Sequence, residues 1–408
     1  MDSSPASPVL RTAEPPVLRN GAEAIARVRS LLPRIAERAE RADIDRGIPR
    51  DTIDELRSSG LFGLVTPRLF GGSELGFADL VQVTAELASA CSSTGWVFGV
   101  LAGHSWLINL FPERAQHEVL DTSTSLIATV FRLAADVVEV EGGYRLKGGE
   151  GRFCSGIDFA DWVIVGNAVK RSAGPPEPRF FVLPRSDIQI VDDWHTIGMR
   201  GTGSRSIRID DAFIPAHRSC GLRDMLAGVS PGADLHGGAI YRMPFSDIAP
   251  FSIIGAPIGM AKGAVDAFAK RVGRELEKAD PLRVAEQSAR LARLAKSSVE
   301  VDAALNLIVS DATRLDSAAD PAEISAAERA KFPRNWAWAA QVSRYAASSL
   351  FEACGGSAVY DNSAEQRVWR DVNAAAQHFA FTWDTAMTSY GRAAARLPPS
   401  GQPIVRTN

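Results

Sequence analysis

The spacing of apolar side chains predicts that the first third of the chain is helical. From Ile25 to Ala39 apolar residues recur every three or four positions, which is the period of an amphipathic helix. Pro33 lies inside this stretch and is expected to kink the helix or end it early. A proline at the start and a glycine at the end mark a short helix between Pro49 and Gly60. Further helices are expected over residues 77–89 and 96–110.

The middle of the chain changes to short runs of β-branched and aromatic residues separated by turn residues, a pattern typical of strands. Glu141-Gly142-Gly143 is a hairpin signal between two such runs. The expected strands cover residues 137–140, 144–147, 162–168, 180–183, 188–191 and 206–209. Together they predict a small β domain.

Helical periodicity returns after about Ser252. Between Leu291 and Ile308 the apolar positions alternate spacings of three and four residues, which is typical of the seam of a helical bundle. Two more helices are expected, over residues 337–353 and 365–392. The pattern divides the chain into a disordered leader (1–20), an N-terminal helical domain (21–125), the β domain (126–225) and a C-terminal helical bundle (226–408).

Composition and charge exclude several classes of protein. The 408 residues carry 45 Lys+Arg and 48 Asp+Glu, a net charge of −3, so we expect neither nucleic acid nor an anionic membrane as a partner. No uninterrupted apolar run reaches the roughly 18 residues of a membrane span. The four cysteines stand far apart, which favours a reducing cytoplasm as the location of the protein.

Common metal, nucleotide and nucleophile motifs are missing from the sequence. The six histidines are scattered without the spacing of a metal site, so no metal is expected. There is no P-loop and no G-x-S-x-G nucleophile elbow. Gly198, Gly201 and Gly203 have no strand-turn-helix context, so a Rossmann-type nicotinamide site is not expected. The pattern alone indicates a soluble α-β-α protein, most simply an enzyme, and does not identify its reaction.

Three segments of the sequence resemble the acyl-CoA dehydrogenase superfamily. Phe153–Trp162 is similar to the superfamily segment that meets the flavin ring, and Trp194–Pro215 is similar to its glycine-rich run, which closes here at Ser204. Gly355-Gly356, followed by Gln366–Asp371, resembles its C-terminal pattern. The resemblance implies an α+β fold with an N-terminal helical domain, a central small β-barrel domain and a C-terminal four-helix bundle.

The departures from that superfamily indicate a branch. Acyl-CoA dehydrogenases need a glutamate base, but the corresponding segment after Asp371 is missing and His378 stands there. The pattern instead resembles the group D flavin-dependent monooxygenases, which include the oxygenase components of p-hydroxyphenylacetate hydroxylase, secosteroid phenol hydroxylases and indole monooxygenases. In that branch one histidine comes from the helical domain and one from the final helix, which here are His104 and His378.

The resemblance implies oxygen chemistry on a flavin. Reduced FAD or FMN, supplied by a separate reductase, would react with O₂ to a C4a-hydroperoxide that hydroxylates a phenol- or indole-type ring. Ser155 would hydrogen-bond flavin N5. His104 would face the substrate and His378 the peroxide, although the sequence does not order these two roles and they could be exchanged.

The resemblance also implies residues that bind the cofactor. Trp96 would pack on the isoalloxazine, beside Ser155 and Gly156. Arg274 would bind the flavin phosphate, often across a subunit interface, with Arg271 as its rival. Gly355 and Gly356 would allow a backbone to approach the flavin closely. Core packing of Trp96, a solvated helix face for the arginines and an ordinary helix end for the glycines are the structural alternatives.

Other functions remain open at this point. N- or S-oxygenation on the same scaffold, an acyl-CoA dehydrogenase with a displaced base, and a non-catalytic bundle that only binds a partner are the alternatives. Phe131, Tyr241 and Phe245 favour an aromatic ligand. By resemblance the assembly is a homo-oligomer, most simply a tetramer packed through the C-terminal bundles.

Overall fold

The computed structural model describes residues 15–121, 124–171, 174–277 and 287–397. Its first part is helical, as predicted from the apolar spacing. The helices are α1 (Gly21–Glu37), α2 (Ala39–Ile44), α3 (Arg50–Ser58), α4 (Phe77–Ala90), α5 (Ser92–Leu107) and α6 (Glu113–Val119). Asn20 caps α1 by accepting a hydrogen bond from the backbone N–H of Glu23. Pro33 lies inside α1, which runs on for one further turn before it ends.

The segment before α1 belongs to the packed protein. Leu18 is buried, and its backbone N–H donates to the Ser73 hydroxyl at 2.9 Å. Part of the predicted leader, around Leu18, therefore packs on the helical domain, and its first fourteen residues lie outside the described residues. The other predicted domain boundaries stay predictions.

The β domain contains two four-stranded sheets, ordered β1-β4-β5-β8 and β2-β3-β7-β6. An isolated parallel bridge, Val138–Lys170, links the two sheets. The strands are β1 (Ile127–Val130), β2 (Leu133–Val140), β3 (Gly143–Cys154), β4 (Trp162–Val169), β5 (Glu177–Pro184), β6 (Gln189–Val191), β7 (Arg205–Pro215) and β8 (Ser219–Gly221). All six predicted strands fall on observed ones, whereas β1 and β8 were missed because both are short and buried along their whole length, which removes the alternation that marks a strand.

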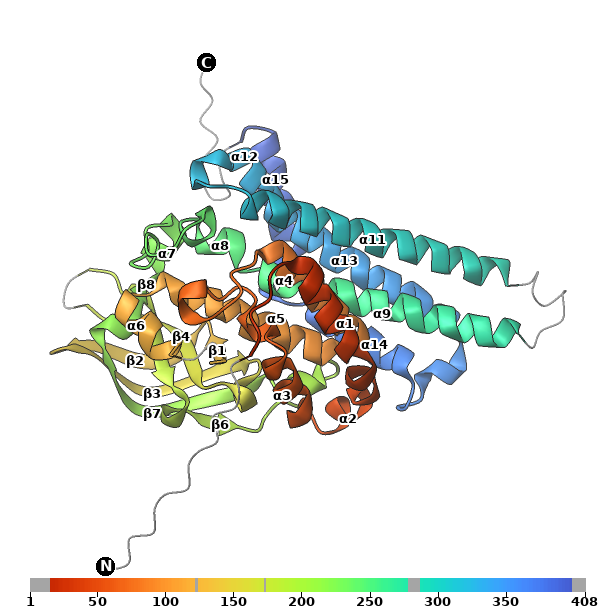
Figure 1. Ribbon diagram of the computed structural model, residues 1–408, viewed down its shortest axis with the longest axis horizontal. Coiled ribbons are helices and arrows are strands. Elements are labelled where there is room, and N and C mark those ends of the chain that lie inside the picture. The colour runs from red at the N-terminus through yellow and green to blue at the C-terminus, as the bar shows by residue number, and fades with distance from the viewer. Residues whose placement is uncertain (1–14, 122–123, 172–173, 278–286, 398–408) are drawn as a thin grey trace, which may run out of the picture.

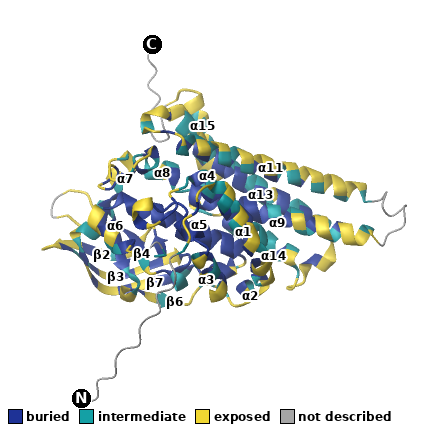
Figure 2. Cartoon of the chain, viewed as in Figure 1, coloured by how far each residue is buried: buried dark blue, intermediate teal, exposed yellow. Residues whose placement is uncertain are grey.

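The C-terminal part is a bundle built on long helices. Its elements are α7 (Leu222–Ala227), α8 (Phe245–Ile248), α9 (Phe251–Leu276), α11 (Ser288–Asp316), α12 (Ala326–Arg329), α13 (Lys331–Ala353), α14 (Ala364–Ala375) and α15 (Trp383–Ala394). Figure 1 shows the β sheets at one end of the molecule and the α9–α11–α13 bundle at the other, with α5 between them. All residues of α5 are buried, and Figure 2 shows the interior around it in dark blue.

The prediction of one continuous final helix over residues 365–392 is wrong. α14 ends at Ala375 and α15 begins at Trp383, and a short 3-10 turn, η11 (Phe379–Phe381), stands between them. Neither proline nor glycine causes this break. Instead the His378 side chain caps the turn, and its ring packs against Trp96 of α5 as well as against Phe379 and Phe381. Tertiary packing therefore overrides the local helix propensity.

One stretch of the bundle is apolar and long enough to cross a membrane by length and composition. It covers Phe245–Leu276, but 78% of its most apolar window is buried inside the protein. It is therefore part of the core of the molecule, and α9 packs against α4, α5, α11, α13 and α14.

Candidate active site

A chain of buried hydrogen bonds lies where the β domain meets α5. The Thr202 hydroxyl donates to the Met199 carbonyl at 2.8 Å, and Thr202 Oγ1 and Ser204 Oγ are 2.7 Å apart. Ser204 Oγ is in turn 2.7 Å from Ser155 Oγ. We call these four groups, from Met199 to Ser155, the hydroxyl chain. The Trp96 indole N–H donates to Ser155 Oγ at 3.2 Å, so two residues predicted to contact the flavin touch each other.

A carboxylate on α14 anchors the far end of the hydroxyl chain. Asp371, buried, accepts a hydrogen bond from the backbone N–H of Met199 at 2.6 Å. Met199 has φ +58°, an uncommon conformation for a residue with a side chain, so this contact holds a strained turn in place. A Cβ on Gly198 would stand 2.3 Å from the carbonyl oxygen of Arg370, so only glycine allows α14 to lie this close to the turn. Burial raises the pKa of Asp371 to about 6.

His104 occupies the second half of α5, and its backbone surroundings fix its tautomer. Its Nδ1 is 2.8 Å from the carbonyl oxygen of Ile127 and 3.2 Å from Thr129 Oγ1. Because a carbonyl oxygen only accepts, Nδ1 carries the hydrogen and donates it. Burial lowers the pKa of His104 to about 4, so the ring is neutral at pH 7. Its Nε2 therefore presents a lone pair and accepts a hydrogen bond or a proton.

His378 lies in the break between α14 and α15 and has the opposite tautomer. The backbone N–H of Ala380 donates to His378 Nδ1 at 3.3 Å, so Nδ1 accepts and the hydrogen of the neutral ring is on Nε2. Burial lowers the pKa of His378 to about 4 as well. The Trp96 and His378 rings meet edge to face, with centroids 5.6 Å apart. The break in the helix thus brings His378 beside the residue that contacts Ser155.

The two histidines lie on a closed path that we call the aromatic circuit, which combines side-chain contacts with short stretches of α5 and of the end of β1. From Trp96 it follows α5 to His104, crosses to Thr129 on β1 and reaches Phe131 just beyond that strand. Phe131 meets Phe379 edge to face at 5.9 Å, and Phe379 lies against His378 at 4.4 Å. His378 closes the circuit on Trp96. The circuit consists of Trp96, His104, Thr129, Phe131, Phe379 and His378.

The outer side of the circuit is aromatic and exposed. Phe131 and Phe379 have 40% and 68% of their surface exposed and contact each other, so together they form an exposed aromatic surface. Phe245 of α8 packs on Phe131, with centroids 6.1 Å apart, so two of the three residues predicted near an aromatic ligand meet here. Tyr241 does not join them, because it is buried against His236, with ring centroids 5.0 Å apart.

Phe153, at the end of β3, is a site residue to which the sequence assigned no individual role. It has φ +64° and 70% of its surface exposed, and its ring meets Trp194 edge to face. Gly156, three residues on, has φ +73°, and a Cβ there would stand 3.0 Å from Val97 of α5. The strand end therefore carries an exposed ring two residues before Ser155.

The predicted phosphate-binding residues form a separate cluster at the other end of α14. Arg274 is exposed near the end of α9, and Gly355 and Gly356 form an exposed turn after α13. Arg271, the rival of Arg274, instead bonds within the chain to Glu365 at 3.1 Å and to the Cys354 carbonyl at 3.2 Å. In Figure 1 the end of α9 lies on the side of the molecule opposite the β sheets.

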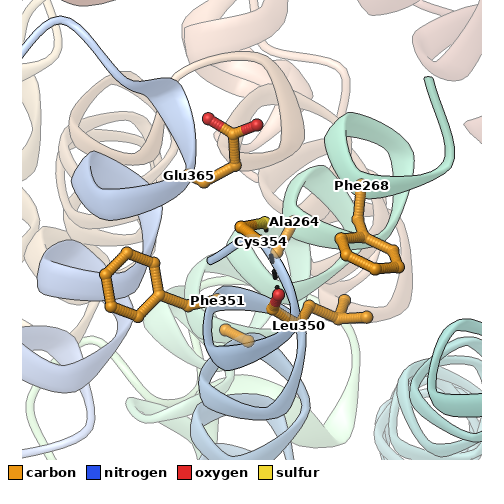
Figure 3. A pocket seen from close by; sticks show the side chains of 7 residues that line it. Ala264, Phe268, Leu350, Phe351, Cys354 and Glu365 are labelled. Carbon is orange, nitrogen blue, oxygen red and sulfur yellow. Dashed lines mark hydrogen bonds between the residues drawn. The ribbon is translucent and has the colours of Figure 1, made fainter. Parts of the chain in front are cut away.

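Figure 3 shows the pocket beneath this turn, where the Cys354 thiol donates to the Leu350 carbonyl at 3.3 Å and Glu365 lies across from Phe268. Its volume is about 10 Å³, enough for one water molecule at most. A larger cavity of about 100 Å³ lies between α2, α9, α14 and the start of α5. Both are smaller than the ~300 Å³ of ordinary small-molecule sites. Among the described residues no group of three or more His, Cys, Asp or Glu side chains has a metal-binding arrangement.

Comparisons with known proteins identify the family of this chain. Family models for the N-terminal and C-terminal domains of acyl-CoA dehydrogenase match residues 22–120 and 252–383. The oxygenase component of the FADH₂-dependent resorcinol hydroxylase of a Rhizobium species is 32% identical and covers 93% of this chain and 95% of its own. The oxygenase component of p-hydroxyphenylacetate 3-hydroxylase of Acinetobacter baumannii is 29% identical, covering 93% and 90%. The crystal structure of the HsaA monooxygenase of M. tuberculosis matches with a TM-score of 0.86 at 31% identity, covering 94% of this chain and 99% of that one.

The fold and these relatives define a flavin-dependent monooxygenase built on the acyl-CoA dehydrogenase scaffold. Within that class the chain belongs to the oxygenase components of two-component flavin-dependent monooxygenases. The family, the fold class, the enzyme class and the flavin cofactor predicted from the sequence are confirmed. The roles of individual site residues stay predictions.

Four further residues of the site had no role predicted from the sequence: Thr129, Thr202, Ser204 and Phe379. Thr202 and Ser204 close the glycine-rich run that carries the resemblance, so that run contained a signal for them. Thr129 lies on β1, which was itself not predicted as a strand. Phe379 depends on the break after α14, and local sequence gave no signal of that break.

Proposed function

We propose that this enzyme hydroxylates a phenol- or indole-type aromatic ring, and that the aromatic circuit binds that ring between the two histidines. The observation that carries the proposal is the pair of opposite tautomers. His104 presents an Nε2 lone pair and His378 an Nε2–H, and both rings are neutral at pH 7. A site with one acceptor and one donor can take a proton from a substrate and supply a hydrogen bond to oxygen.

His104 acts as the acceptor toward the substrate. A phenol O–H or an indole N–H that shares its hydrogen with Nε2 becomes more electron-rich, which favours attack by the ring on an electrophilic oxygen. The Nδ1 contact with the Ile127 carbonyl supports the positive charge that develops when Nε2 takes the proton, and it holds the ring in one orientation. The proposal thereby orders the two histidine roles that the sequence left open.

His378 acts as the donor toward oxygen. Its Nε2–H can hydrogen-bond an oxygen atom beside the flavin ring and hold it against loss as H₂O₂. Its Nδ1 accepts a hydrogen bond from the Ala380 N–H, so a 180° flip of the imidazole ring would break that hydrogen bond. Phe131 and Phe379 shield this space from water and provide apolar surface for the substrate ring.

The residues present fit a flavin. Ser155 has an acceptor site beside the Trp96 indole, the exposed Phe153 ring lies two residues earlier in the chain, and Gly156 keeps the backbone next to Ser155 free of a side chain. These residues would hold the isoalloxazine of reduced FAD or FMN. When bound, reduced flavin supplies the two electrons that turn one O₂ into a ring hydroxyl and water. Arg274, Gly355 and Gly356 would hold its phosphate end from a neighbouring subunit.

The proposal is tested by complete turnover. The protein is mixed with a flavin reductase, NADH, FAD or FMN and ¹⁸O₂, together with resorcinol, p-hydroxyphenylacetate or an indole, and the products are analysed by mass spectrometry. We expect one ¹⁸O atom in a new ring hydroxyl of at least one substrate. Oxygen found only on nitrogen or sulfur of probe amines and thiophenes would replace ring hydroxylation with heteroatom oxygenation.

Three further features belong to the same proposal. A separate reductase supplies the reduced flavin, because the sequence has no Rossmann-type nicotinamide motif.

The subunits form a homotetramer through the bundle, which fits the exposed Leu291 and Val299 on the outer half of α11. The protein works in the cytoplasm, in keeping with its four free buried cysteines. Light scattering of the purified protein, alone and as Val299→Glu, tests the assembly: the wild type should be a tetramer and the variant smaller.

A further inference from the structure

The direction of every hydrogen bond in the hydroxyl chain can be assigned. The chain has three contacts: Thr202 to the Met199 carbonyl at 2.8 Å, Thr202 to Ser204 at 2.7 Å and Ser204 to Ser155 at 2.7 Å. Three hydroxyl groups take part, and each has one hydrogen to donate. Ser155, Thr202 and Ser204 are all buried, so water does not compete for these hydrogens.

The Met199 carbonyl decides the assignment. A carbonyl oxygen cannot donate, so the Thr202 hydrogen is used on Met199. The contact between Thr202 and Ser204 then needs the Ser204 hydrogen, and the contact between Ser204 and Ser155 needs the Ser155 hydrogen. The Trp96 N–H donates to Ser155 from the other side, which agrees with this direction. Ser155 Oγ therefore has no hydrogen to offer a ligand and keeps one acceptor position.

This fixed direction has a consequence for the two redox states of a flavin. Reduced flavin carries a hydrogen on N5 and can donate it, whereas N5 of oxidised flavin has only a lone pair. We propose that Ser204, by taking the Ser155 hydrogen, makes the site selective for reduced over oxidised flavin. The proposal rests on the proposed function, in which Ser155 faces N5. Oxidised flavin would place two lone pairs against each other, and the site releases it after turnover.

Ser204 is a positioning residue in this scheme, because it acts only through Ser155. In Ser204→Ala the Ser155 hydrogen is released and can turn toward the ligand, so Ser155 can donate to the oxidised N5 as well as accept from the reduced one. One neutral hydrogen bond exchanged for a lone-pair contact corresponds to a change of about tenfold in affinity. The effect falls mainly on the oxidised form.

The experiment measures both dissociation constants. Oxidised FMN and FAD are titrated by flavin fluorescence, and the dithionite-reduced forms are titrated anaerobically, on wild type and on variants. We expect the ratio of the oxidised to the reduced constant to fall about tenfold in Ser204→Ala. The midpoint potential of the bound flavin should then fall by about 30 mV relative to wild type, the equivalent of a tenfold change for two electrons.

Matched variants separate this effect from simple disturbance of the fold. Ser206→Ala is the control, because Ser206 is equally buried two residues further on and its hydroxyl donates to Asp193 at 2.6 Å, outside the chain. Its ratio should stay that of wild type. Thr202→Val removes the acceptor of the Ser204 hydrogen in the hydroxyl chain. Ser204 can then donate to Ser155, which frees the Ser155 hydrogen for the ligand, so this variant should also lower the ratio of the oxidised to the reduced dissociation constant. In Thr202→Val the Met199 carbonyl still accepts the hydrogen bond from the Trp194 indole N–H at 2.9 Å, so it does not become unpaired.

The possible outcomes distinguish this inference from the proposed function. If wild type binds neither flavin form, the flavin site itself is wrong. If wild type binds reduced and oxidised flavin equally well, or if Ser204→Ala and Thr202→Val keep the wild-type ratio and potential, the selection by Ser204 is overturned while the hydroxylase function stands. If Ser204→Ala does not fold, the Thr202→Val ratio decides.

Discussion

The two candidate histidines stand in contrasting parts of the molecule. His104 lies inside α5, a regular helix whose residues are all buried between the β domain and the bundle. His378 lies where the helical path breaks after α14, beside Phe379, which has 68% of its surface exposed. Both rings have a pKa of about 4. The difference between them lies in the backbone group that each Nδ1 meets.

That difference shows how one residue type can provide two functions. A carbonyl oxygen from β1 makes His104 Nδ1 a donor, and an amide N–H from the turn makes His378 Nδ1 an acceptor. Nε2 is consequently an acceptor in one ring and a donor in the other. Local burial fixes the charge of each histidine, and the neighbouring strand or turn fixes its direction.

The largest effect is expected from removing the acceptor on α5. His104→Asn keeps an N–H that can reach the Ile127 carbonyl but removes Nε2, so kcat/KM for a phenol should fall by about 100-fold or more. Product is measured by chromatography at saturating reduced flavin. For a nitrophenol already ionised in solution the loss should be much smaller, because that substrate has no proton to give.

The matched control for this variant is His236→Asn. His236 is half-buried and pairs with Gln116 at 2.7 Å, away from the aromatic circuit, so its kcat/KM should stay within about twofold of wild type. An equal loss for the ionised and the neutral phenol in His104→Asn would mean that His104 does not receive the substrate proton.

The next largest effect is expected from substituting His378, in the break between α14 and α15. His378→Asn can mimic Nδ1 but not the Nε2–H, so product per reduced flavin should fall about tenfold while H₂O₂ rises. His378→Gln can place an N–H near the Nε2 position and should lose less. Oxygen uptake and peroxide are measured together, with the exposed neighbour Gln377→Ala as the control. Equal uncoupling by Asn and Gln would remove the donor role from Nε2.

The same contrast shows which features could be predicted from the sequence. α5 is long and apolar, so a helix was predicted there from its apolar run, and His104 followed from the resemblance. The segment around His378 has high helix propensity, and its break depends on contacts with Trp96 and Phe131, residues far away in the chain. Opposite tautomers depend on hydrogen-bond partners from β1 and η11, and no residue pattern within one element contains that information.

A smaller effect is expected at the exposed rim of the circuit. Phe379→Ala removes the ring that bridges Phe131 and His378, so KM for the aromatic substrate should rise about three- to tenfold with little change in kcat. Leu69→Ala, a similarly exposed apolar side chain on another surface, is the control. A fall in kcat with an unchanged KM would mean that Phe379 acts through His378 and does not contact the substrate.

The smallest effect is expected in the pH dependence of the free energy of unfolding, which shows whether His104 on α5 is neutral in the folded protein. Its folded pKa of about 4 lies below the ordinary 6.5, so between these values the unfolded chain binds a proton that the folded one does not. The free energy of unfolding should therefore fall as the pH falls, and His104 should contribute about 0.7 kcal/mol of this between pH 7 and pH 6. Burial raises the pKa of Asp371 and Asp316 to about 6, which acts in the opposite direction, so the pH dependence of His104→Asn is subtracted from that of wild type to cancel both carboxyls. Urea titrations at the two pH values measure the difference. If wild type and His104→Asn show no difference, His104 is protonated in the folded state as readily as in the unfolded one. His104 would then not be the neutral acceptor on α5 that the comparison with His378 requires.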